Sequence, residues 1–138
     1  MKKINCVICL LLCIGWFSCD SDPELPQGDY KVEFLIINAT LQNLKCEAQA
    51  KDLKGLYPGG KVVEQIPSYS QFTLQTLYQD QWTETPLSVL AVFESIKISN
   101  STGATTTNVL DPYLWMEIKA KTEKKITYAL TINSSFFE

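Results

Sequence analysis

The sequence of 138 residues contains no arginine and no histidine, and both absences limit what the chain can do. Without arginine there is no planar fork of donors for bidentate recognition of phosphate or carboxylate groups. Without histidine the chain lacks the commonest general base and the commonest transition-metal ligand. Lysine supplies all 12 positive charges against 15 acidic residues, so nucleic acid is a poor candidate partner. We expect a protein that is not an enzyme, with no metal site and no cofactor.

The first 18 residues are predicted to be a secretory signal and not part of the fold. Lys2 and Lys3 precede an apolar run that covers residues 4–17. A membrane-spanning helix needs about 20 apolar residues, so this run is too short to be one. A positive start followed by a short apolar run is the pattern of an export signal.

The position of one cysteine indicates how this signal ends. Of the five cysteines, only Cys19 stands after a small residue, Ser18, at the end of the apolar run. This arrangement resembles the lipobox of bacterial lipoproteins, although Trp16 stands where leucine is usual. The resemblance implies cleavage after Ser18 and acylation of Cys19, so that the protein reaches the membrane through a lipid. Cys46 would then be the one cysteine left, and its alternating apolar surroundings indicate a buried small hydrophobe.

Residues 19–29 form a predicted acidic tether. Asp20, Asp22 and Glu24 alternate with other residues and are followed by prolines, a composition typical of a solvated, extended segment. A calcium loop is the weaker alternative. The stretch also resembles the acidic export signal of lipoproteins shown on the outer face of the outer membrane. We therefore expect an outer-membrane protein that faces the exterior, with the periplasmic face as the alternative.

From residue 30 onward, the pattern of short alternating or apolar runs predicts strands. The expected strands cover residues 30–37, 43–50, 62–66, 70–78, 88–99 (broken into two near Glu94), 104–110, 114–121 and 126–132. In 70–78, the side chains expected to share one face are Phe72, Leu74, Thr76 and Tyr78. No helix is expected. About seven to nine strands in one domain, residues 30–138, predict an all-β fold: a two-layer antiparallel β-sandwich of immunoglobulin-like architecture.

Several short motifs in this body resemble one group of proteins. They are "IIN-AT" at the first strand, "YPGG", "FESIKIS" followed by an N-x-x-G hairpin, and the closing "ITYALTI". In these motifs the chain is similar to the small single-domain surface lipoproteins of Bacteroidota. The resemblance implies a β-sandwich and a surface location, and it brings no catalytic residues.

Aromatic residues are the candidate ligand-binding groups. Trp82 lies in the polar stretch "QDQWTETP", and Tyr113 and Trp115 lie in "DPYLW". An exposed aromatic ring can stack on a sugar or anchor a protein partner. The alternative for each of them is packing over the open end of the sandwich. The chain also has three Asn-x-Ser/Thr sequons (at Asn38, Asn100 and Asn133), which we attribute to chance in a threonine-rich sequence.

The leading hypothesis is a non-enzymatic, lipid-anchored surface protein that acts as an interaction or accessory module. Two specific roles stay open. One is a glycan-binding accessory protein of a polysaccharide-uptake system. The other is a structural subunit of a fimbria-like or envelope assembly, which would need an unpaired strand edge, expected beside the last strand, residues 126–132.

Overall fold

The computed structural model describes residues 30–53, 57–79, 88–106 and 108–137. The predicted signal (1–18) and tether (19–29) lie outside these ranges, and the first strand begins at Tyr30. In chain order the elements are β1 (Tyr30–Asn38), β2 (Leu44–Ala50), β3 (Gly60–Ile66), β4 (Gln71–Gln79), α1 (Val89–Val92), β5 (Phe93–Ser99), η1 (Pro112–Leu114), β6 (Trp115–Ala120), η2 (Lys121–Glu123), β7 (Lys125–Ile132) and η3 (Ser134–Phe137).

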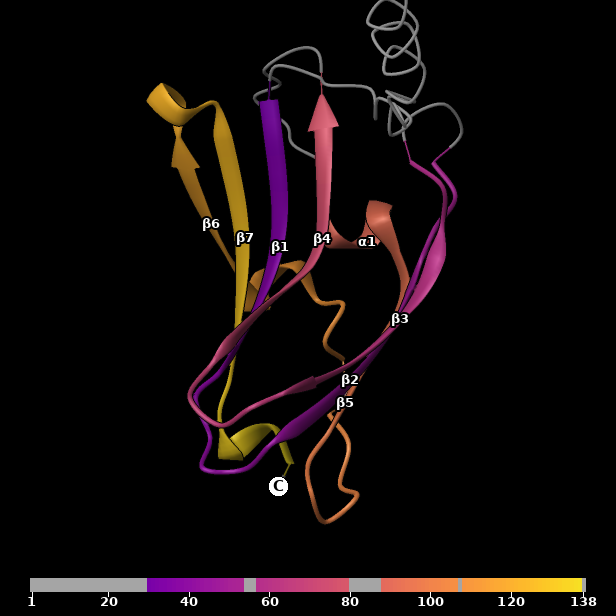
Figure 1. The fold of residues 1–138 in the computed structure, drawn as a ribbon, viewed down its shortest axis with the longest axis vertical. Coiled ribbons are helices and arrows are strands. Elements are labelled where there is room, and N and C mark those ends of the chain that lie inside the picture. Colours follow the sequence, from indigo (N-terminus) through magenta and orange to yellow (C-terminus); the bar gives the residue numbers. More distant parts are fainter. Residues whose placement is uncertain (1–29, 54–56, 80–87, 107, 138) are drawn as a thin grey trace, which may run out of the picture.

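The seven strands form two sheets that pack face to face, which confirms the predicted all-β sandwich (Figure 1). One sheet has the order β4-β1-β7-β6 and the other the order β3-β2-β5. The prediction of antiparallel pairing throughout is wrong at one place, because β1 and β7 lie parallel at the centre of the larger sheet. The strand order also differs from that of a constant-type immunoglobulin domain, so the likeness lies in the two-layer architecture.

The core lies between the two sheets and is centred on Phe34 of β1. Its ring meets that of Phe93 edge-on at 5.3 Å and stacks on that of Tyr128 at 5.2 Å, measured between ring centroids. Alternate residues of β1 and β2 point inward and are almost fully buried, as the sequence pattern predicts. Cys46 belongs to this core, which confirms that it is a buried side chain.

β4 departs from its predicted pattern because a β-bulge interrupts its pairing with β1. Leu74 is the extra residue and has no opposing residue on β1. One extra residue moves the following side chains to the opposite faces of the sheet. Leu77 is therefore buried beside Leu74, and the prediction that Thr76 and Tyr78 share the core face is wrong.

The segment 88–99 contains a helical turn that the pattern did not predict. Val89–Val92 form α1, and β5 begins directly afterwards at Phe93. Val89 and Val92 are buried while Leu90 is exposed, so a short apolar run fits one helical turn as well as it fits a strand. The predicted pair of strands is wrong, since this segment forms one turn of helix and one strand.

The predicted return strand over 104–110 is also wrong. In the described residues, its contacts with β5 are a bridge between Ser99 and Thr105 and two hydrogen bonds, from the Thr106 N–H to the Ile98 carbonyl at 2.8 Å and from the Ile98 N–H to Thr106 Oγ1 at 3.3 Å. Asn108 then takes a left-handed backbone conformation, with φ of 60°, which ends the extended path.

The three sequons have a structural cause instead of the chance origin that we expected. In each, the Asn Oδ1 accepts hydrogen bonds from the N–H and the hydroxyl of the residue two places on, at 2.6–3.1 Å. Such Asx turns offer the backbone an alternative to the strand ladder. They stand where β1, β5 and β7 end, at Asn38, Asn100 and Asn133.

Within the described residues, the outer strands are β4 and β6 in the larger sheet and β3 and β5 in the smaller one. The last strand, β7, is paired on both sides, with β1 and with β6. The predicted free edge beside residues 126–132 is therefore wrong. None of the helices in the described ranges has the length and apolar character needed to cross a membrane.

Candidate functional site

The four residues singled out from the sequence fall in different environments. Cys19 and Trp82 lie outside the described residues. Trp115 is only 6% exposed, and its indole N–H donates to the Val109 carbonyl at 2.9 Å, so its ring is part of the core. Tyr113 is 97% exposed on η1, directly before the outer strand β6. The structure therefore does not bring Tyr113 and Trp115 together as one aromatic surface.

Nucleophilic and metal-binding chemistry finds little support in the described part of the chain. No cluster of three or more Cys, Asp or Glu residues that could hold a metal ion occurs there. Burial, and secondly the charge of Glu47, raise the pKa of the Cys46 thiol to about 12. The thiol is therefore protonated at neutral pH and is not a nucleophile.

The least exposed of the ion-paired carboxylates, that of Glu33, is held by two lysines on the outer face of the larger sheet. Its two oxygens lie 2.5 Å from Lys31 Nζ and 2.6 Å from Lys125 Nζ. Burial by itself would raise the pKa of Glu33, but the hydrogen bonds from Lys125 and Lys31 outweigh it and hold the pKa below its usual value. A carboxylate kept ionised between two ammonium groups is a structural ion pair and a poor general acid.

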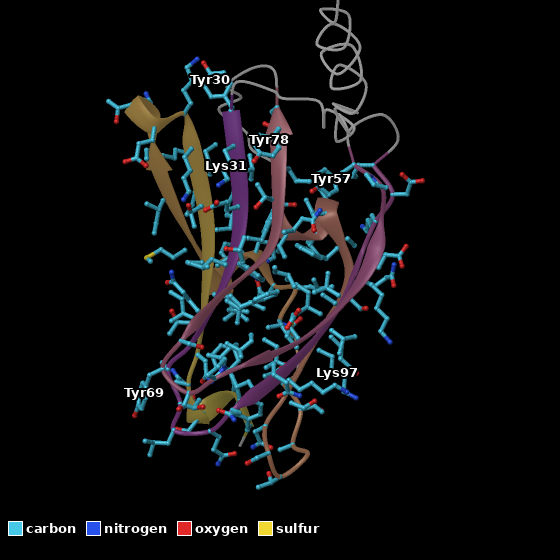
Figure 2. The ribbon with its side chains drawn as sticks, viewed as in Figure 1. Tyr30, Lys31, Tyr57, Tyr69, Tyr78 and Lys97 are labelled. Carbon is cyan, nitrogen blue, oxygen red and sulfur yellow. The ribbon has the colours of Figure 1, made fainter. Side chains whose placement is uncertain are left out.

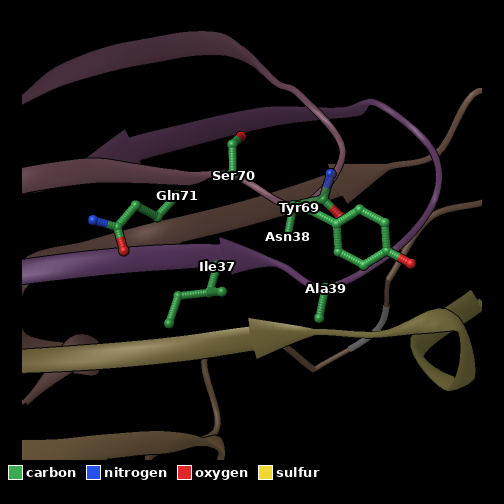
Figure 3. Close-up of a pocket in the computed structure, with 6 residues that line it drawn as sticks. All are labelled: Ile37, Asn38, Ala39, Tyr69, Ser70 and Gln71. Atoms are coloured by element: carbon green, nitrogen blue, oxygen red, sulfur yellow. The ribbon is translucent and has the colours of Figure 1, made fainter.

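A hollow of about 550 Å³ opens where β1 ends and β4 begins (Figure 3). The residues that line it come from the end of β1 and the residue after it, from the loop between β3 and β4, and from the start of β4: Ile37, Asn38, Ala39, Tyr69, Ser70 and Gln71. None of them is charged. The hollow therefore offers an apolar floor, one aromatic ring and the hydroxyl and amide groups of Ser70 and Gln71.

Asn38 fixes the shape of this hollow, because its buried side chain joins two turns that are distant in sequence. Its Nδ2 lies 2.8, 3.1 and 2.9 Å from the carbonyl oxygens of Gln42, Ile66 and Pro67, to which it donates. Its Oδ1 accepts from the N–H and hydroxyl of Thr40. The backbone adds a hydrogen bond from the Asn38 N–H to the Ser70 carbonyl, at 2.8 Å. The two turns thus form one rigid unit.

Tyr69 is the unusual residue of the site. Its φ is 53°, in the left-handed region that a bulky side chain rarely adopts, and the residue is 69% exposed. Figure 2 shows it at the lower end of the molecule, outside the ribbon. This backbone conformation costs about 1 kcal/mol relative to glycine at the same place. This backbone conformation and this exposure distinguish Tyr69 from the other residues that line the hollow.

The surrounding turn holds Tyr69 in this conformation. The Ser70 hydroxyl donates to the Pro67 carbonyl at 2.7 Å, and the Ser68 N–H donates to Asn43 Oδ1 at 3.2 Å. The sequence reasoning missed Tyr69 because this residue falls between the strands predicted over 62–66 and 70–78. An aromatic residue between two serines, in a turn with no apolar neighbour, is the signal that could have identified it.

Neither a family model, nor a curated protein, nor a solved structure matches this chain. The resemblance to Bacteroidota surface lipoproteins stays a prediction from the sequence.

Proposed function

We propose that this chain is a non-enzymatic, lipid-anchored protein of the outer membrane, and that its sandwich binds a neutral sugar at the hollow beside Tyr69. The observation that carries the proposal is the exposed Tyr69 ring, held in a strained backbone conformation next to a hollow without charged side chains.

The chemistry of the hollow suits a sugar ring. The C–H face of a pyranose packs on an aromatic face, while its hydroxyls need partners that both donate and accept. Tyr69 supplies the aromatic face, the amide of Gln71 can both donate and accept, and the Ser70 hydroxyl, which donates to the Pro67 carbonyl, can still accept. Ile37 and Ala39 supply the apolar floor that small-molecule sites usually have. Because no lining residue is charged, a neutral sugar fits better than an acidic one.

The sequence supports the cellular part of the proposal. An apolar run ends at Ser18–Cys19, and the acidic segment 19–29 could extend over about 35 Å at about 3.3 Å per residue. A sandwich tethered in this way would stand clear of the lipid headgroups. Display toward the exterior follows from the resemblance of this tether to surface-export signals.

A glycan array tests the ligand. We expect the parent protein to bind neutral oligosaccharides and Tyr69→Ala to lose that binding. Leu41→Ala is the matched control, because Leu41 is an exposed apolar residue (81%) in the adjacent β1–β2 turn that does not line the hollow. Trp82→Ala tests the sequence prediction in the same assay. Identical glycan profiles for the parent and Tyr69→Ala would refute the ligand assignment.

Metabolic labelling with an alkyne fatty acid tests the anchor separately. The parent chain should take up the label and Cys19→Ala should not. Label on the Cys19→Ala protein would refute the anchor without affecting the ligand assignment.

A further inference from the structure

Exposed apolar side chains gather on η1 and on β6, which follows it. Eight large hydrophobic residues of the described chain are exposed, and four of them lie in this short stretch: Tyr113, Leu114, Met116 and Ile118. Among the residues that the structure describes, β6 is also an outer strand of the larger sheet and pairs on one side only, with β7. An edge strand with free backbone groups and apolar side chains is a template for pairing with another strand.

We propose that β6 pairs with β6 of a second copy of this chain. The two strands would run antiparallel about a two-fold axis at Ile118 and join two four-stranded sheets into one. This interface is separate from the Tyr69 hollow, which lies at the β1–β4 side of the sheet, and it does not depend on the ligand.

Charge complementarity selects both the partner and the register. With the axis at Ile118, Glu117 of each copy lies opposite Lys119 of the other, which gives two attractive cross-strand pairs. Moving the axis to Glu117 or to Lys119 would place two like charges directly opposite each other. The sequence "MEIKA" is therefore self-complementary with the axis at Ile118, and moving the axis by one residue in either direction is unfavourable.

The side chains concerned are already available. Lys119 Nζ and Glu117 Oε1 lie 2.7 Å apart within the same strand, and both side chains are more than a third exposed, at 39% and 36%. Dimerisation would exchange the two pairs within strands, one in each copy, for two equivalent pairs between strands. On the outer face, Ile118 would meet Ile118 of the second copy, and Met116 would meet Ala120. These contacts remove apolar surface from water, which supplies the driving force.

One outer strand of the smaller sheet, β3, provides an internal control. β3 also carries an exposed apolar residue, Val63, at 48% against 47% for Ile118. If β3 paired with itself about Val63, Lys61 would face Gln65 and Val62 would face Glu64, so no opposite charges would meet. Self-pairing is therefore expected at β6 and not at β3.

Charge reversal tests the pairing in cells that produce the whole chain with two different tags. Like charges lie opposite each other in Glu117→Lys and in Lys119→Glu. Each variant should therefore copurify with a differently tagged copy of itself about tenfold less, or lower still, than the parent does. Producing the two variants together restores opposite charges, and so does the double reversal within one chain. Both combinations should recover copurification to the parent level. Single reversals that copurify like the parent would overturn the proposal, and so would combinations that fail to recover.

Cysteine crosslinking locates the axis. In the whole chain, Ile118→Cys should give a disulfide-linked dimer under mild oxidation, while Val63→Cys should stay monomeric. Equal crosslinking of the two variants, or none by Ile118→Cys, would overturn the proposed edge.

Discussion

Replacing Asn38 tests whether one buried amide holds together the two turns that form the hollow. In Asn38→Ala the carbonyl of Ile66 loses its buried hydrogen bond. The carbonyls of Gln42 and Pro67 keep other donors, the hydroxyls of Thr40 and Ser70 respectively. Losing the Nδ2 donor at a buried carbonyl costs about 1–2 kcal/mol, and the lost partner of the part-buried Thr40 N–H adds about 0.5 kcal/mol, while the Thr40 hydroxyl keeps the Gln42 carbonyl as its acceptor. We therefore expect the free energy of unfolding to fall by about 2 kcal/mol.

The matched control is Asn100→Ala. Asn100 forms the same kind of Asx turn, with Thr102 and Ala104 as donors, but this turn is exposed or only part-buried. Water can replace the lost contacts, so the expected cost is about 1 kcal/mol or less. Urea unfolding followed by intrinsic fluorescence measures both variants, with the free energy taken by linear extrapolation.

A third variant separates the role of the amide from that of side-chain volume. Asn38→Asp keeps the shape and Oδ1, but it turns an acceptor toward the carbonyls that Nδ2 now contacts. Its cost should equal or exceed that of Asn38→Ala. If Asn38→Ala costs no more than Asn100→Ala, or if Asn38→Asp is as stable as the parent, the reasoning about the buried amide is refuted.

Three further predictions follow from the packing and charge of the sandwich. A Cβ on Gly59 would lie 2.6 Å from the Asp52 backbone nitrogen, whereas a Cβ on Gly60 would meet nothing within 4 Å. Thermal unfolding should therefore show Gly59→Ala to be less stable than Gly60→Ala by about 1–3 kcal/mol. The pKa of Glu33 in the folded protein lies below its usual 4.5, so its contribution to stability is present above that pH and is lost as the pH falls through the lower, folded value. As the pH is lowered, the free energy of unfolding should fall less steeply for Glu33→Gln than for the parent protein. Parallel curves for the two proteins would contradict the ion pair. The Cys46 thiol should react with a thiol reagent only after unfolding, and fast reaction in the folded protein would contradict its burial.

The sequence was most informative where alternation is uninterrupted. In β2, and in β1 up to Phe34, polar and apolar residues alternate and the apolar ones are buried, so polarity alone predicts both the strand and its inner face. In β4 the prediction failed beyond Leu74, because a bulge is decided by pairing with β1, which the local sequence does not encode. The segment 88–99 was misjudged because four apolar residues fit one helical turn as well as a strand.

The candidate site was harder to predict than the fold, since it depends on contacts between distant turns. Asn38 joins a turn at residues 39–43 to another at residues 67–70, and its part in the sequon gave no indication of this. Tyr69 gains its significance from a backbone angle, which a sequence does not display. Trp115 looked like Tyr113 in the sequence, yet the indole N–H of Trp115 has a partner inside the core, while the Tyr113 ring stands on an exposed 3-10 turn. Trp115 and Tyr113 are therefore distinguished by their surroundings in the fold.

The measurement that tests the central claim most directly compares stability and sugar binding in Tyr69→Gly. Glycine adopts the left-handed conformation without strain, so the free energy of unfolding should stay equal to that of the parent or rise by up to about 1 kcal/mol. The ring is lost, so binding of neutral oligosaccharides, measured by calorimetric titration, should disappear. A protein that is at least as stable as the parent but no longer binds sugar is the result we predict. Sugar binding that persists undiminished in a stable Tyr69→Gly protein would contradict the account.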